Sequence, residues 1–412
     1  MAGLCEGGNE PPGSLKASKS LGEVATECMV EAAEEAVQEN AGSTDIAIAI
    51  DGSWQKRGHT SLNGVVTATS IDNGKVVDVV CLTKYCHGCV VTKNKVDHTS
   101  NCVKNFDGAS ETMEVEGAVQ IFKRSIEERG VRYSTYLGDG DSRGFQQVVN
   151  EKPYGEHFKI EKWECLGHVQ KRMGNRLRKL VKDMKGQKLA DGKIIGGRNR
   201  LTKDAIGLLQ LYYGNAIRNN TDDINKMKRA VWAMYFHKLS TDEQPHHQLC
   251  PKGPDSSCKY NVDQSTCKHN GLPVEVMTKL KPIYRDLAHP DLLKKCVHGL
   301  TQNPNESFNN LVWLRVPKTT FVGLKSLKAG VYDAVISFNV GNIGRAKVLQ
   351  NLGIAPGYNT LTFLRELDDI RVAKADQAVE LMSKAARQKK RNLKRRREDE
   401  EANNPGYGAG KF

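Results

Sequence analysis

Residues 46–50 most constrain the fold, because they form an unbroken apolar run that ends at a carboxylate. The run reads Ile-Ala-Ile-Ala-Ile and is followed by Asp51 and Gly52. Five apolar residues bounded by a turn signal are too short for a helix and are typical of a buried strand. Open α/β sheets have their sites at the carboxyl ends of such strands. A carboxylate there is poorly hydrated unless a cation or donor meets it, although Asp-Gly is also a common turn.

The segments that follow alternate between strand and helix patterns. Residues 60–71 and 75–83 are β-prone and flank Asp72-Asn73-Gly74, a hairpin signal in which Asn73-Gly74 accepts positive φ. A helix, a strand, a short helix, a strand and a basic helix are predicted next, over residues 112–129, 133–138, 142–150, 158–165 and 168–185. The order β-β-β-α-β-α-β-α predicts an α/β fold, with a ribonuclease H-like mixed sheet and flanking helices.

Composition divides the chain into five expected segments. Residues 1–44 are Gly-, Ser- and Glu-rich and predict a disordered tail, with a short helix near Glu23–Glu39 as a variant. The other segments are the first part of the core at 45–188, with a cysteine-rich module at 81–102; a mostly helical insertion at 189–300, with a His/Cys-rich loop at 246–269; completion of the core and C-terminal helices at 301–383; and a basic, then acidic tail at 384–412.

The charge balance favours an anionic partner. Lys and Arg exceed Asp and Glu by 61 − 48 = 13, which suits DNA, RNA or an anionic membrane surface. No apolar run approaches the ~20 residues of a membrane helix, and the N-terminus has no signal-peptide core. The 11 cysteines are therefore expected as metal ligands or free thiols. Residues 384–397 carry nine Lys and Arg and resemble a nuclear localisation signal or a nucleic-acid patch.

Three acids have positions that suit a metal-dependent site. Asp51 and Asp139 each end a predicted buried strand, and Glu306 begins a predicted helix. Converging carboxylates repel one another, and divalent cations relieve that repulsion. Two Mg²⁺ ions about 3.5–4 Å apart can activate a water or a 3′-hydroxyl for phosphoryl transfer. Asp141 is the alternative second acid, and turn formation by the two aspartates or helix capping by Glu306 would be the purely structural roles.

One cysteine-rich segment has the ligand types and spacing of a closed tetrahedral zinc site. Its candidate ligands are Cys86, Cys89, His98 and Cys102, with Cys81 and His87 as substitutes. The paired spacing favours zinc over buried free cysteines. A second, less specific set of candidate zinc ligands comprises His247, Cys250, Cys258 and Cys267, with His246 and His269 as competitors.

Cys165 and His168 connect a predicted strand to a basic helix. A catalytic Cys-His pair is disfavoured, because this spacing at a helix start points both side chains at local structure. The basic helix is predicted either to contact phosphates or to be a solvated surface. Its cationic residues are Lys171, Arg172, Arg176, Arg178, Lys179 and Lys182.

Four segments, in order, resemble the Mutator-like transposase domain of eukaryotic cut-and-paste elements. They are Ile-Ala-Ile-Asp-Gly-Ser-Trp with Gly58, Leu-Gly-Asp-Gly-Asp-Ser, Glu-Cys-Leu-Gly-His-Val-Gln-Lys-Arg and Asn-Pro-Asn-Glu-Ser-Phe-Asn-Asn. The likeness runs from about Asp45 to Val340. It implies a ribonuclease H-like fold, a DDE triad of acids, a Cys-x2-His motif after the second acid and a mostly helical insertion before the last acid.

The resemblance implies a role for each matching residue. Asp51 would be the first catalytic acid, Asp139 the second, with Asp141 as the alternative, and Glu306 the last. Cys165 and His168 match the Cys-x2-His motif and count among the candidate metal ligands. The implied cofactors are two Mg²⁺ or Mn²⁺ ions besides structural Zn²⁺. The implied partners are double-stranded DNA, as terminal repeats and target, and further copies of the chain on DNA, in the nucleus.

The expected function is therefore DNA cleavage and strand transfer by a DDE transposase. The alternatives are a domesticated DNA-binding protein without turnover and a nuclease that cuts but does not join. Many relatives carry a separate DNA-binding domain ahead of the core, whereas the 44 residues before Asp45 show no zinc-finger or helix-turn-helix pattern. We expect end recognition by the insertion, the zinc modules and the basic tail, or a shortened copy of an element protein.

Overall fold

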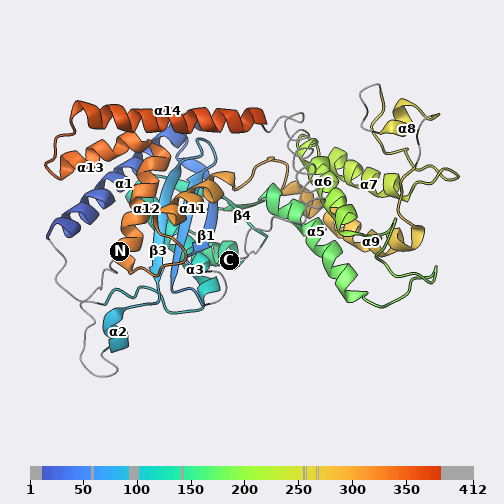
Figure 1. Ribbon diagram of the computed structural model, residues 1–412, viewed down its shortest axis with the longest axis horizontal. Helices are drawn as coiled ribbons and strands as arrows, with labels where there is room; N and C mark the ends of the chain where they lie inside the picture. The colour runs from blue at the N-terminus through green and yellow to red at the C-terminus, as the bar shows by residue number, and fades with distance from the viewer. Residues whose placement is uncertain are drawn as a thin grey trace, which may run out of the picture.

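A five-stranded mixed sheet, in the order β3-β2-β1-β4-β5, lies at the centre of one lobe (Figure 1). The computed structural model describes residues 12–56, 60–91, 102–140, 143–253, 256, 258–265, 267 and 269–381. The strands are β1 (Asp45–Trp54), β2 (Asn63–Ser70), β3 (Val76–Thr83), β4 (Arg132–Gly138) and β5 (Glu161–Glu164). β2 is antiparallel to β1 and β3, whereas β4 is parallel to β1 and β5. The predicted α/β class with flanking helices is confirmed.

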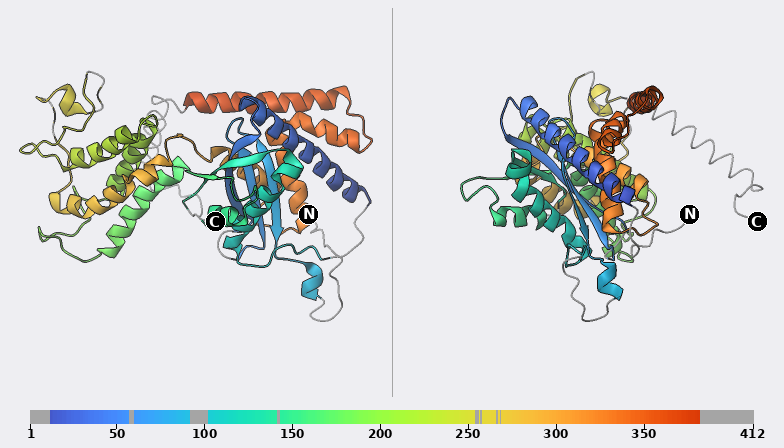
Figure 2. Two further views of the ribbon diagram at one scale, coloured as in Figure 1. Left: turned by 180° about the vertical axis from the view of Figure 1, so that it is seen from behind. Right: turned by 90° about the vertical axis from the view of Figure 1, so that its left-hand side faces the viewer.

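Helices cover both faces of this sheet (Figure 2). Because side chains alternate along a strand, neighbouring residues of β2 enter different cores. Val66 packs with Phe122 of α3 (Met113–Arg129), and α4 (Arg143–Glu151) joins the same core. Val65 packs with residues of α11 (Asn303–Arg315) and α12 (Leu324–Asn339). The α11 residues therefore approach the sheet from the face opposite α3.

The N-terminal segment differs from expectation. The prediction of a disordered tail is wrong for residues 12–39, which form helix α1 (Pro12–Glu39); the short helix expected near Glu23–Glu39 is the second half of this longer one. Its buried face is made of small and sulfur-containing residues such as Ala25, Met29 and Ala33, and it packs beside α12 and β3. An Ala-rich face gives a weak hydrophobic pattern in the sequence, although alanine is the best helix former. Burial against α12 stabilises the helix.

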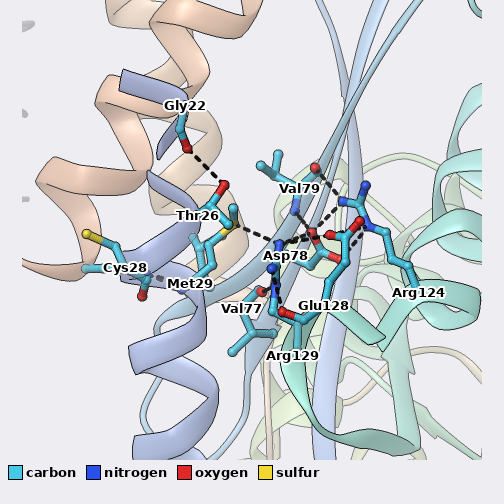
Figure 3. Close-up of polar contacts among 12 residues, drawn as sticks. Gly22, Thr26, Cys28, Met29, Val77, Asp78, Val79, Arg124, Glu128 and Arg129 are labelled. Atoms are coloured by element: carbon cyan, nitrogen blue, oxygen red, sulfur yellow. Dashed lines mark hydrogen bonds and ion pairs between the residues drawn. The ribbon is translucent and has the colours of Figure 1, made fainter. Parts of the chain in front are cut away.

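A buried ion cluster ties α3 to strand β3, at the edge of the sheet (Figure 3). The Asp78 carboxylate is fully buried and accepts hydrogen bonds from Arg124 Nε at 2.9 Å and Arg129 Nη2 at 3.1 Å. Arg129 Nε also donates to the Val77 carbonyl at 2.8 Å. A buried carboxylate is stable only when it is paired and hydrogen-bonded in this way.

The second lobe is helical and has a core of its own (Figure 1). It comprises α5 (Leu166–Asp183), α6 (Lys203–Arg218), α7 (Ile224–Leu239), α8 (Lys259–Val262), α9 (Val274–Leu287) and α10 (Pro290–Lys294). The chain enters and leaves this lobe side by side. Glu164 N–H donates to the Lys295 carbonyl at 2.9 Å, and Leu166 N–H donates to the Leu300 carbonyl at 3.1 Å.

The remaining elements lie around the sheet lobe. They are α2 (His87–Val91), the 3-10 helices η2 (Ser110–Thr112) and η3 (Asn342–Gly344), α13 (Arg345–Asn351) and the long α14 (Tyr358–Leu381). Strand β5 is shorter than the predicted 158–165, because only residues 161–164 pair with β4. Among the helices that the structure describes, none has both the length and the apolar character needed to cross a bilayer. The basic segment 384–397 lies outside the described residues.

Candidate active site and cysteine clusters

Asp51 and Asp139 lie at the carboxyl ends of two neighbouring strands, on the same side of the sheet. β1 and β4 are parallel neighbours, and their last registered pair is Ala49 with Leu137. Asp51 and Asp139 are each two residues further along, so the two-residue pleat repeat sends their side chains toward the same face. The apolar run that makes β1 a central strand therefore also delivers Asp51 to this side of the sheet, beside the acid that follows β4.

Helix α11 is fixed over the same strands by a buried amide. Asn305 Nδ2 donates to the carbonyl oxygens of Ala49 at 3.1 Å and Thr67 at 3.2 Å. Its Oδ1 accepts from the Thr69 hydroxyl at 2.8 Å. Because Asn305 bridges β1 and β2, the next residue, Glu306, is held near the carboxyl end of β1.

Two further amides, one from the residue that precedes α11 and one from within the helix, reach the end of β1. Gln302 Nε2 donates to the Ile50 carbonyl at 2.5 Å. One helical turn beyond Glu306, Asn309 Nδ2 donates to Asp51 Oδ2 at 2.7 Å. The sequence did not single out Gln302 or Asn309, although both follow the helical i, i+3 and i, i+4 spacing around Asn305 and Glu306.

Electrostatics joins the three acids into one site. Burial, and then the charges of Glu306 and Asp139, together raise the pKa of Asp51 to about 6. The hydrogen bond from Asn309 acts in the opposite direction. Desolvation and like charges both disfavour an ionised carboxylate. The Asp51 carboxylate therefore interacts with both of the other predicted acids.

Helix α5 brings a histidine and a lysine toward these acids. His168 Nδ1 lies 3.4 Å from Asp139 Oδ2, and Lys171 Nζ lies 4.0 Å from Glu306 Oε1. Both Lys171 and Glu306 are more than half exposed, so this weak pair leaves room for a ligand between them. The basic helix thus starts at the acidic site and continues into the second lobe.

Lys162 is a site residue that the sequence did not reveal. Its Nζ donates to the Asp139 carbonyl at 3.1 Å and lies 4.4 Å from the centre of the Tyr136 ring. Burial lowers the pKa of this ammonium to about 8, while the charges of Glu164 and Asp139 oppose the shift. The lysine belongs to β5, a four-residue strand with no motif that could have marked it.

The remaining predicted residues of this site are only partly brought together. Asp141 lies outside the described residues, so Asp139 is the second acid whose surroundings are visible. Buried Cys165 accepts from the Gln302 N–H at 3.4 Å, whereas His168 faces Asp139. In the described ranges, the groups whose ligand atoms all lie within 4.8 Å of one another contain neither Cys165 nor His168, nor the three acids.

The acids nevertheless fit a divalent cation in chemical type. Carboxylate oxygens are the hard ligands that Mg²⁺ and Mn²⁺ take. Repulsion from Glu306 and Asp139 already raises the pKa of Asp51, and a bound cation would reverse that effect. A bound cation would also draw the carboxylate oxygens together, whereas without it their like charges repel each other.

In the first predicted cysteine cluster, three of the four predicted ligands lie close together. The sulfur atoms of Cys86, Cys89 and Cys102 all lie within 4.8 Å of one another, and the Cys89 and Cys102 sulfurs are 3.6 Å apart. His98 lies outside the described residues. The candidate substitute Cys81 is buried in β3 and does not belong to this group.

The second cluster has a membership different from the one predicted. It consists of His237, His247, Cys250 and Cys258, and Cys267 is not part of it. His237 belongs to the last turn of α7, where the sequence pattern shows only a basic residue near a helix end. The spacing of ligands within the loop does not predict His237, because this residue meets the loop only through a tertiary contact.

A model of the Mutator-like transposase family matches residues 13–258. The matched region runs from α1 to the second cysteine cluster and includes Asp51 and Asp139. No curated protein and no solved structure matches the chain.

Proposed function

The chain belongs to the Mutator-like transposase family, and from this membership we propose that it is a DNA transposase that uses Asp51, Asp139 and Glu306. It would hydrolyse a phosphodiester at an element end, and the freed 3′-hydroxyl would then attack target DNA. One observation carries the proposal: Asp51, from the central strand, is electrostatically coupled to both Glu306 and Asp139. Three acids from separate parts of the chain meet near the carboxyl end of β1.

The strand order supports a ribonuclease H-like core. β1, β2 and β3 are antiparallel, and β4 and β5 continue the sheet in parallel from β1; along the chain, these elements follow the order from which the ribonuclease H-like fold was predicted. In this arrangement the first two acids leave adjacent parallel strands at their carboxyl ends, where α/β sheets have their sites. The helical lobe enters after β5 and returns just before the helix that carries Glu306.

Asp51, Asp139 and Glu306 would hold two Mg²⁺ or Mn²⁺ ions, which activate the attacking oxygen and stabilise the leaving oxygen in an in-line phosphoryl transfer. The chain's own residues orient these acids. Asn309 fixes one oxygen of Asp51, and Lys162 holds the backbone of Asp139. Lys171, near Glu306, offers an exposed cation to the DNA backbone beside the reacting phosphate.

The α5 surface supports a path for DNA away from the acids. Lys171, Arg178 and Lys182 on α5, and Lys185 two residues beyond its end, are exposed, and their spacing follows one face of a helix. The opposite face carries the buried residues Val169, Met173 and Leu177. A row of cations that begins at the acids suits a polyanion that must reach them.

The proposal also includes zinc binding, nuclear targeting and self-assembly on DNA. The sulfurs of Cys86, Cys89 and Cys102 would bind Zn²⁺, with His98 as the proposed fourth ligand. A Cys89–Cys102 sulfur separation of 3.6 Å agrees with the ~3.8 Å edge of a tetrahedron with Zn–S bonds of ~2.3 Å. The basic segment 384–397 would direct the protein to the nucleus. Cleavage at two element ends would require more than one copy of the chain on DNA.

A domesticated, catalytically silent DNA-binding protein is the second candidate. It is favoured by one observation, namely that the three acids are not at metal-ligand spacing within the described part of the chain. In such a protein Asp51 would keep its hydrogen bond from Asn309 without any cation. Such a protein would bind DNA through α5 and would never cut it.

Cleavage of a supercoiled plasmid with Mg²⁺ or Mn²⁺ tests the catalytic proposal. The wild type is expected to nick and join the DNA, and Glu306→Gln to lose both products while binding DNA. Glu116→Gln, an exposed acid on α3, is the control and should cleave normally. Binding without cleavage by all three proteins would favour the silent alternative, and nicks without joined products would identify a nuclease.

A further inference from the structure

We propose that His237, His247, Cys250 and Cys258 form a closed, four-coordinate Zn²⁺ site in the helical lobe. The proposal does not depend on whether the acids at the sheet edge are catalytic. It differs from the site that sequence spacing predicts, because a histidine from helix α7 takes the place of Cys267. The site would attach the long loop between α7 and α9 to the helices beneath it.

The distances among the four ligand atoms fit tetrahedral zinc. The Cys250 sulfur lies 3.6 Å from His237 Nδ1 and 3.8 Å from His247 Nδ1. The Cys258 sulfur lies 3.8 Å and 3.3 Å from the same two nitrogens. Zn–S bonds of ~2.3 Å and Zn–N bonds of ~2.0–2.1 Å at tetrahedral angles separate sulfur from nitrogen by about 3.5 Å.

A second layer of hydrogen bonds prepares His247 for a metal. Its Nε2 lies 2.8 Å from His269 Nε2, and His269 Nδ1 lies 2.6 Å from an Asp242 carboxylate oxygen. An ionised Asp242 can only accept, so His269 Nδ1 carries a proton; in a neutral His269 the Nε2 atom then accepts the Nε2 proton of His247. This direction of donation leaves the His247 Nδ1 lone pair facing the two sulfurs. Metal-bound histidines characteristically donate their other nitrogen to such a partner.

The ligand type and burial select a structural zinc ion. Thiolates and imidazoles favour Zn²⁺ over Mg²⁺ or Ca²⁺, which take oxygen ligands. His247, Cys250 and Cys258 are exposed by only 4%, 5% and 2%, although each is polar. Four protein ligands leave no open position for substrate, so the ion would be structural.

The surrounding loop has few other means of stabilisation. In the described residues between α7 and α9, the largest buried side chains are the three ligands from the loop itself. Within this loop the short helix α8 has no buried residue. A metal clip that closes a long loop replaces the missing apolar core. Tyr260 stacks on His247 with ring centroids 4.3 Å apart and covers the site.

Zinc content of the purified full-length chain tests the ligand set. Metal analysis of His237→Ala and Cys258→Ser should show one zinc per chain fewer than the wild type. Cys267→Ser is the matched control and should keep the wild-type content. Loss of zinc in Cys267→Ser with retention in His237→Ala would overturn this ligand set, and unchanged content in Cys258→Ser would overturn the site itself.

Zinc affinity tests the second layer and remains informative if a ligand variant fails to fold. Competition with a chromophoric chelator should show affinity reduced roughly 10–100-fold in Asp242→Ala and His269→Gln, with unchanged content at saturating zinc. Glu243→Ala, the exposed neighbour of Asp242, should bind as the wild type does. Wild-type affinity in both second-layer variants would overturn the proposed orientation of His247.

Discussion

Asp51 is the residue in which the requirements of folding and of the proposed chemistry conflict most directly. The apolar run before it takes the carboxylate to a poorly hydrated strand end, where burial and then the charges of Glu306 and Asp139 raise its pKa to about 6. The ordinary value for this group is 3.8. Its charge therefore destabilises the fold at neutral pH unless a cation is bound.

Replacement of Asp51 by Asn should stabilise the metal-free protein at pH 7. The folded wild type holds this proton more tightly than the unfolded chain does, so its stability falls as the pH rises from about 4 to about 6. Asp51→Asn removes that fall. The variant should gain on the order of 2 kcal/mol at pH 7 and equal the wild type at pH 4.

Chemical denaturation across this pH range measures the effect. Asp376→Asn, an exposed carboxylate on α14, is the control and should leave the pH profile unchanged. Added Mg²⁺ should raise the melting temperature of the wild type and not that of Asp51→Asn. A wild-type profile parallel to that of the variant between pH 4 and pH 6 would contradict the proposed origin of the shift.

At the scale of elements, helix α11 is the platform of the site. Its position over the sheet depends on Asn305, whose side chain is fully buried and bonds to both β1 and β2. These bonds lie one residue before Glu306 and four before Asn309. Any shift of the helix would therefore move the third acid and release Asp51 from its donor together.

Asn305→Ala should destabilise the protein by about 1–3 kcal/mol, because it leaves a buried hydroxyl and two carbonyls without their partner. It should also reduce cleavage at a temperature at which the variant is still folded, since Glu306 is no longer fixed. Asn310→Ala changes an exposed amide on the same helix and should cost less than about 0.5 kcal/mol. Equal losses in the two variants would show that α11 is held by its apolar face alone.

The elements differ in how far the sequence could predict them. The buried run before Asp51 and the hairpin turn after β2 determine local structure by themselves, so those strands were predictable, and parallel pairing then brings Asp51 beside Asp139. Helix α1 was predictable only as a short helix near Glu23–Glu39 and not over its full length, because an alanine face is recognised only once α12 covers it. His237 and Lys162 were missed for a related reason: their roles depend on tertiary contacts between segments with no shared motif.

At the scale of the whole molecule, α5 connects the acidic site to the helical lobe. Its first turn provides the contact of His168 with Asp139, and its buried face belongs to the core of the lobe. The exposed cations along it form the surface on which the proposed DNA path depends. Sequence-independent binding to phosphates of this kind is measured by its salt dependence.

Replacing Arg178, Lys182 and Lys185 together by Gln should weaken DNA binding uniformly across sequences. The slope of log K against log salt should fall by up to about 3, since each phosphate contact contributes about 0.9. Titration of a labelled duplex at several salt concentrations measures it. The control removes equal charge at Lys16, Lys19 and Lys347 on α1 and α13, at the far end of the sheet lobe (Figure 1), and should keep the slope. An unchanged slope in the α5 variant would make that face a solvated surface.

The paired entry and exit of the helical lobe have a consequence for how such a chain can diversify. Because Glu164 and Leu166 hydrogen-bond to Lys295 and Leu300, the segments that enter and leave the lobe are held together. The lobe is therefore joined to the sheet as a cassette on a stem of two paired chain segments. Its length and content can change without altering the distance that the stem spans or the order of the strands. Selection on what the cassette binds is thereby separated from selection on the sheet that carries the acids.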